Sequence, residues 1–363
     1  MERIGRHSFR FTDEYYGEID QMRFSVGMGI PMTLAEVESE AKVVEDAGFD
    51  YVTLVDTPAL GRDMNIMMAV AANATNRVRI GQGVADPMTM HPMYIANSAA
   101  TINEISRGRA FIGISVGNPY YKYRPPATVA ELRDAIVFMK HFMAGEDAEF
   151  AGVRCASEWI GEPLPIYVAA NGPRALQVGG ELADGVISLG SLPAHMRWVR
   201  RQIEIGAERA GRNPKDVDLW TRSMVYVCDD VAEARRETSA FPSTYANVHQ
   251  LLSRSNSAIV ELRAMLDEWQ PGYSQSLIDD SKSFFDVFDP ALAERLDVPH
   301  NEAVSNRLIN HFHLIGRPEQ IIERIGELHE VGVTTVSMTT YTLIDRPGMI
   351  QQVGSKVIAQ LRN

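Results

Sequence analysis

Residues 22–56 read MRFSVGMGIPMTLAEVESEAKVVEDAGFDYVTLVD and contain the unit from which the rest of the fold is built. The apolar run 22–30 is typical of a buried strand, and 34–47 has the apolar spacing of an amphipathic helix. Gly48 suits the position just after a helix, because glycine readily adopts the left-handed backbone found there. A second strand, 51–55, follows at once. The order strand, helix, strand predicts parallel strands joined by a helical crossover.

The same unit recurs along the chain. Further strands are predicted at 78–81, 110–115, 166–170, 185–189, 217–227 and 334–339, and further helices at 65–74, 92–105, 129–143, 174–182, 194–210, 319–331 and 349–361. Eight strand–helix units favour a closed barrel over an open sheet. The sequence therefore predicts an α/β protein with a (β/α)8 TIM barrel.

Two segments interrupt this rhythm. Residues 148–159 are expected to form a β-hairpin, and 232–310 a partly helical insertion after the seventh strand. Insertions of this length usually cover a site or form an interaction surface. We therefore expect an N-terminal extension at 1–21 and a single barrel domain at 22–363. Five aromatic residues of the insertion either form its own small core or face an apolar substrate: Trp269, Tyr273, Phe284, Phe285 and Phe288.

The bulk composition argues against several classes of function. The chain has 363 residues and a formal net charge of -12, and so acidic a surface repels nucleic acid and anionic lipid. Neither a signal peptide nor an apolar run of membrane-spanning length is present, so we expect a cytoplasmic protein. Cys155 and Cys228 form no CxxC motif. His311 and His313 alternate on an expected extended segment without a third ligand nearby, so no metal site is expected.

In a barrel of this kind the active site lies where strands end and the following loops begin. The residues there are small or polar, which lets the backbone approach a flat ligand, although each glycine could equally serve only its own turn. The helix that starts near Asn171 offers N–H groups suited to a phosphate. Asp56, directly at a strand end, could orient a ring, hold a proton or cap a turn. The candidate cofactor-binding residues are Asp56, Gly83, Val84, Ala85, Ser115, Gly117, Asn118, Asn171, Gly172, Pro173, Arg174, Gly190 and Ser191.

Several common catalytic motifs are absent from the sequence. There is no GxGxxG, GxSxG, P-loop or HExxH pattern, so the corresponding dinucleotide-binding, hydrolase, nucleotidase and zinc-protease interpretations lack support. His91 is followed by a proline at a helix start, and we expect it to be a structural cap.

The loops at the strand ends resemble a known family. The stretches 48–56, 62–63, 81–87, 91–92 and 106–109 resemble deazaflavin-dependent methylenetetrahydromethanopterin reductases, and 169–174, 181–185 and 316–319 resemble the wider bacterial-luciferase-like superfamily. The resemblance covers about 22–230 and 312–361. It implies a barrel of the luciferase-like type and an oxidoreductase that binds a flavin or deazaflavin.

The resemblance also implies features of the site. It places a non-prolyl cis peptide near Gly83–Val84, in a bulge that backs the cofactor ring, and Asp56 near that ring. It implies a homodimer formed through the helices at 65–74 and 92–105. The chain departs from sugar-phosphate-oxidising relatives, because Thr57 replaces their histidine and Asn118 their glutamate. Alcohol oxidation by that acid–base pair is therefore not expected.

Three functions follow as hypotheses. The first is a deazaflavin-dependent reductase or dehydrogenase that uses coenzyme F420 and a small organic substrate, with Asp56, Asn118 and Tyr120 as candidate catalytic residues and Tyr121 as another candidate proton donor. The second is a monooxygenase that uses reduced FMN supplied by a partner flavin reductase. The third is a non-catalytic flavin-binding relative.

Overall fold

The barrel predicted from the repeated strand–helix unit is present. The computed structural model describes residues 18–58, 60–117, 125–230, 234, 242–288, 303–340 and 343–362. Eight parallel strands close in the order β1-β12-β9-β8-β7-β4-β3-β2. They are β1 (Arg23–Met28), β2 (Tyr51–Leu54), β3 (Arg79–Gln82), β4 (Ala110–Ile114), β7 (Ile166–Ala169), β8 (Gly185–Leu189), β9 (Asp218–Ser223) and β12 (Thr335–Thr339). The predicted fold class is therefore confirmed.

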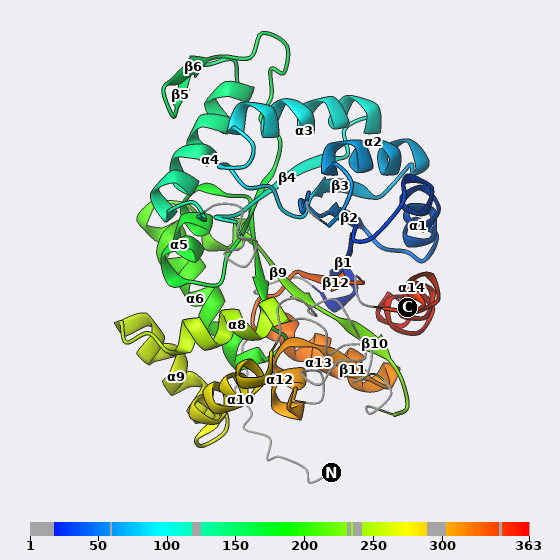
Figure 1. The fold of residues 1–363 in the computed structure, drawn as a ribbon, viewed down its shortest axis with the longest axis vertical. Helices are drawn as coiled ribbons and strands as arrows, with labels where there is room; N and C mark the ends of the chain where they lie inside the picture. Colours follow the sequence, from blue (N-terminus) through cyan, green and yellow to red (C-terminus); the bar gives the residue numbers. More distant parts are fainter. Residues whose placement is uncertain are drawn as a thin grey trace.

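Helices surround the barrel, as Figure 1 shows. They are α1 (Leu34–Asp46), α2 (Met64–Ala74), α3 (Pro92–Ser106), α4 (Val129–Met143), α5 (Pro173–Leu182), α6 (Pro193–Arg209), α13 (Pro318–Glu330), α14 (Arg346–Val353) and α15 (Ala359–Leu361). Helix α1 begins in a capping box of Thr33 with Glu36, and α4 in one of Thr128 with Glu131. Such caps satisfy backbone N–H groups that a helix leaves unpaired at its start. No helix of the described residues is long and apolar enough to cross a membrane.

The seventh predicted strand is shorter than expected. It ends at Ser223, and β10 (Val225–Val227) leaves the barrel to pair in parallel with β11 (Leu314–Gly316). The point where the chain leaves the barrel is held from outside, because the Ser223 hydroxyl at the end of β9 donates to the Phe312 carbonyl at 2.5 Å. The prediction of one continuous strand over 217–227 was wrong for this reason. The expected hairpin at 148–159 is present as β5 (Ala148–Phe150) and β6 (Val153–Cys155).

The described part of the long segment between β10 and β11 is largely helical. It contains α8 (Pro242–Leu252), α9 (Ser257–Trp269), α10 (Tyr273–Val287) and α12 (Asn306–Phe312), which lie together beside the barrel in Figure 1. We call these four helices the helical excursion. Phe284 is fully buried and packs against Tyr245, with ring centroids 5.2 Å apart. Phe285 and Phe288 contact Phe284 in turn, so these aromatic residues form the excursion's own core.

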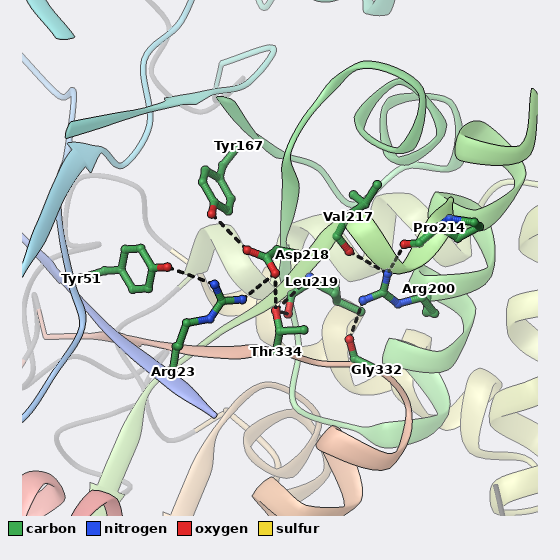
Figure 2. Close-up of polar contacts among 10 residues, drawn as sticks. All are labelled: Arg23, Tyr51, Tyr167, Arg200, Pro214, Val217, Asp218, Leu219, Gly332 and Thr334. Carbon is green, nitrogen blue, oxygen red and sulfur yellow. Dashed lines mark hydrogen bonds and ion pairs between the residues drawn. The ribbon is translucent and has the colours of Figure 1, made fainter. Parts of the chain in front are cut away.

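The barrel interior is closed at the end where the strands begin. Arg23 of β1 pairs with Asp218 of β9 at 2.5 Å, and both reach tyrosines of other strands, Tyr51 and Tyr167. Figure 2 shows this network, together with Arg200 of α6 donating to loop carbonyls at the same end. Above the ion pair lies a buried layer of four aromatic side chains and one isoleucine, which we call the aromatic layer: Tyr51, Phe111, Tyr167, Trp220 and Ile187. A ligand can therefore enter the barrel only from the strand C-termini.

Candidate functional site

The chain forms a bulge directly after β3, at the position expected for a cofactor ring. The Gly83–Val84 peptide bond is cis, as the resemblance predicts. Gly83 N donates to Leu54 O of β2 at 2.7 Å, and Ala85 N donates to Gly113 O of β4 at 2.9 Å. The backbone of the bulge is therefore held by both neighbouring strands.

Glycine at position 83 is required by the barrel itself. A Cβ there would lie 2.6 Å from the Cβ of Thr53 on β2, which is far inside normal contact distance. A larger residue at 83 would thus disturb the fold as well as any ligand. The half-buried side chain of the bulge belongs to Val84, which packs with Ala169 over the aromatic layer. Val84 and Ala169 form a small apolar floor for the barrel mouth.

Asp56 follows β2 and stands half-buried beside this floor. Burial raises the pKa of its carboxyl group, and the nearby charges of Asp86 and Asp63 raise it further. Asp86 caps the turn after the bulge by accepting from Met88 N at 2.9 Å. A carboxyl group whose pKa is raised in a cleft is a candidate for proton transfer.

The loop after β4 completes this side of the mouth. Ser115 is half-buried, and its Oγ accepts from Gly117 N at 3.0 Å. Gly117 has a φ of 87°, and any Cβ there would collide with the Asp86 carboxylate. The candidate residues Asn118 and Tyr120, and Tyr121 beside them, lie outside the residues that the structure describes.

A second group of candidates lies at the ends of β7 and β8. The Asn171 Oδ1 accepts from Leu189 N at 3.0 Å and from Ser188 Oγ at 3.2 Å, so this side chain ties the two strands together. Gly172 is the N-cap of α5, and Pro173 is the first residue of that helix. Arg174 is exposed. Exposed Arg254 of the excursion places its guanidinium 3.7 Å from the position a Gly172 Cβ would take.

Gly190 and Ser191 face the helical excursion. A Gly190 Cβ would lie 3.0 Å from His195 Nδ1 of α6. Ser191 is fully buried, donates its hydroxyl to His313 O at 3.0 Å and accepts from Arg324 at 2.9 Å. These two contacts use the Ser191 hydroxyl within the protein, so we do not expect it to bind a ligand.

Three buried histidines join the excursion to this part of the barrel. His195 Nδ1 lies 2.9 Å from His311 Nε2, and His311 Nδ1 lies 3.3 Å from the Tyr273 hydroxyl. His313 Nε2 lies 3.2 Å from the Tyr245 hydroxyl. We call His195, His311 and His313 the histidine cluster. His311 lies in the last turn of α12 and His313 is the C-cap of that helix, so the extended segment expected at 311–313 is instead a helix end.

The cluster makes the excursion part of the mouth. Val248 and Leu251 of α8 line a small cavity together with Asn171, Leu189 and His195.

No group of three or more metal-ligating side chains occurs within the described ranges. His91 accepts from Met93 N at 3.1 Å as the N-cap of α3, so its expected role as a structural cap is confirmed.

One charged residue of the mouth is not among the candidates predicted from the sequence. Arg222 of β9 is half-buried, and its Nη1 donates to Gly83 O at 3.2 Å. Its position in the strand held the signal, because Asp218, Trp220 and Arg222 alternate along β9 and must share its interior face.

Comparison with known proteins agrees with this architecture. The family model of luciferase-like monooxygenases matches residues 17–335. The chain belongs to this family. Among the curated relatives of this luciferase-like chain is the 5,10-methylenetetrahydromethanopterin reductase of Archaeoglobus fulgidus, 27% identical over 94% of this chain and 100% of that protein.

Solved structures show the same luciferase-like barrel. The coenzyme F420-dependent tetrahydromethanopterin reductase of Methanopyrus kandleri superposes with a TM-score of 0.74 at 22% identity, covering 94% of this chain and 99% of that chain. The oxygenating constituent of 3,6-diketocamphane monooxygenase from Pseudomonas putida, in complex with FMN, gives 0.63 at 17% identity, covering 93% and 98%. The predicted recognition as a luciferase-like oxidoreductase is confirmed, because the family model matches most of the chain and the curated relatives include a reductase over its full length.

Proposed function

We propose that this chain is an oxidoreductase that binds coenzyme F420, a deazaflavin, at the barrel mouth and transfers a hydride to or from a small organic substrate. The observation that carries the proposal is the bulge at residues 83–85, whose fixed backbone adjoins a floor of small apolar side chains. A flat ring needs such a surface, because bulky side chains would prevent close stacking. The similarity to curated F420-dependent dehydrogenases supports the deazaflavin over FMN.

The residues present fit such a coenzyme. Val84 and Ala169 offer an apolar face for the ring. The carboxyl group of Asp56, whose pKa is raised by burial and by Asp86 and Asp63, could exchange a proton with the bound ligands. The start of α5, where Gly172 is the N-cap, offers the backbone N–H groups of Arg174 and Ala175 to a phosphate, since Pro173 itself has none. Arg174 and Arg254 add positive charge there in a chain whose net charge is -12. A bound deazaflavin would supply the ring carbon that accepts or donates the hydride, and the protein would orient it and exclude water.

Cofactor titration tests this function. We expect the purified protein to bind coenzyme F420 at least tenfold more tightly than FMN, as followed by cofactor fluorescence. A double variant, Arg174→Gln with Arg254→Gln, should weaken binding of phosphate-bearing FMN but leave riboflavin binding unchanged. Arg201→Gln, on the outer face of α6, is the control for loss of charge.

The alternatives give different outcomes in the same experiment. Tighter binding of FMN, with oxygen consumed when reduced FMN is supplied, would instead identify a monooxygenase that depends on a flavin reductase. Binding of neither cofactor would contradict the proposal and leave the non-catalytic relative.

We also propose that the chain forms a homodimer through α2 and α3. The alanine and methionine residues of these helices pack inward, since Met67, Met68, Ala96 and Ala99 are fully buried. The outer face carries other apolar side chains, namely Ile66, Tyr94 and Ile105, which are 54%, 59% and 40% exposed. Apolar patches on a surface usually mark contacts with another chain.

Light scattering tests the dimer. The wild type is expected to have twice the chain mass at micromolar concentration, and the double variant Ile66→Glu with Tyr94→Glu the mass of one chain. Val260→Glu, at an equally exposed position on α9, should leave the mass unchanged. A monomeric wild type would remove the proposal without affecting the cofactor site.

A further inference from the structure

Arg222 crosses the barrel mouth from one wall to the other. In the closed strand order, β9 and β3 are separated by three strands on either side, so they stand opposite each other. Arg222 Nη1 of β9 nevertheless reaches Gly83 O at the end of β3, at 3.2 Å. A guanidinium therefore lies across the floor of the mouth and holds the bulge.

The apolar surroundings of the Arg222 guanidinium strengthen the electrostatic effect of its charge. Trp220, two residues earlier on the same strand face, belongs to the buried aromatic layer, so the medium below Arg222 is apolar and contains little water. Charges interact more strongly in such surroundings than in bulk solvent. Arg222 is itself only half-buried, so its charge also acts on whatever occupies the mouth above it.

We propose that Arg222 is a cofactor-facing cation that favours the reduced form of the bound ring. This inference rests on the proposed function. When a hydride reaches the ring, a C–H bond of the donor breaks and its electron pair forms a new C–H bond on the ring. The ring then carries one more negative charge, and the oxidised donor loses a proton or keeps the positive charge. A fixed cation at the floor of the site stabilises the ring after this transfer more than before it.

The test compares affinities for the two redox forms of coenzyme F420. In Arg222→Gln, binding of the reduced coenzyme should weaken at least tenfold more than binding of the oxidised one. For a two-electron couple this corresponds to a fall of about 30 mV in the midpoint potential of the bound coenzyme. Arg222→Lys keeps the charge and should restore most of the preference. Arg201→Gln, which removes a charge from the barrel exterior, should not change it.

A second measurement needs no variant. The fixed charge should make the bound reduced coenzyme lose its ring proton at a lower pH than the free coenzyme, as followed by absorbance in the wild type. Equal weakening of both redox forms in Arg222→Gln, or an unchanged ring deprotonation on binding, would reduce Arg222 to a support for the bulge and overturn the inference. A wild type that binds no deazaflavin in either form would instead contradict the proposed function.

Discussion

Replacing Asp56 by asparagine is expected to lower kcat roughly 10²- to 10⁴-fold, the usual contribution of a positioned acid or base. Asparagine keeps the size of the side chain but cannot exchange a proton at neutral pH. Because the change affects proton transfer and leaves the floor of the site intact, the affinity for coenzyme F420 should stay within a few fold. The measurement is single-turnover hydride transfer followed by deazaflavin absorbance, beside a binding titration.

The dependence of activity on pH shows whether Asp56 acts as a proton donor. Burial, Asp86 and Asp63 raise the pKa of Asp56, so its carboxyl group stays protonated to a higher pH than an exposed aspartate. In the direction that reduces the substrate, where the acid must donate, activity should fall as pH rises through this pKa. Asp86→Asn removes one of the charges that raise it and should move that fall to lower pH. A variant Asp56→Asn with wild-type kcat would show that Asp56 only packs against the site.

The histidine cluster should make the fold sensitive to acid. Burial lowers the pKa of His195 from 6.5 to about 4 and that of His313 to about 3, and it lowers the pKa of His311 well below 6.5. The unfolded chain therefore binds protons at these imidazoles before the folded chain does. Their contribution to stability is complete above about pH 6.5 and is lost as the pH falls from there toward about 4.

The expected size of this loss is large for a single side chain. At pH 5, about 1.5 units below the unfolded pKa, each histidine that stays neutral in the fold costs about 2 kcal/mol of unfolding free energy. Urea unfolding at pH 7.5, 6 and 5 measures it. The variant His195→Gln should start less stable at pH 7.5, because it loses the contact with His311, but lose about 2 kcal/mol less than the wild type on going to pH 5.

An exposed histidine supplies the control for this experiment. His141 of α4 lies at the surface beside Glu146 and outside the cluster, and His141→Gln should still show the loss of stability toward pH 5 that the cluster causes. The same loss of stability in His195→Gln and wild type would show that the cluster is not the source. Because the cluster holds α12 against α6, the excursion should be the first part to open in acid, which hydrogen exchange at its amides would detect.

Local patterns determined most of the architecture. The alternation of apolar runs and amphipathic helices set the number, order and approximate bounds of the barrel strands, because each signal lies within about fifteen residues of chain. The resemblance of residues 81–87 to the reductases placed both the bulge after β3 and the cis bond at Gly83–Val84. The proline at position 92 marked the start of α3 in the same way.

Contacts between distant residues determined the rest. The hydrogen bond from Arg222 to Gly83 joins positions 139 residues apart and exists only because the barrel closes and brings β9 opposite β3. Ser191 looked like a small residue at an open strand end, but His313, which follows α12, and Arg324 of α13 bury it. At the end of the seventh strand, the Ser223 hydroxyl donates to the carbonyl of Phe312, 89 residues away in the chain.

The sequence by itself therefore determined a closed barrel of eight strand–helix units and a carboxylate after the second strand, and its resemblance to a known family gave the bulge after the third. Periodicity and turn chemistry are local, so they can be read without knowing which segments meet. Only the tertiary structure decided which strand-end residues remain open to a ligand and which are buried. It also showed that a cation spans the mouth and that three histidines join the excursion to the barrel. Those features depend on side chains from opposite walls and from an insertion coming together, and no local pattern encodes that meeting.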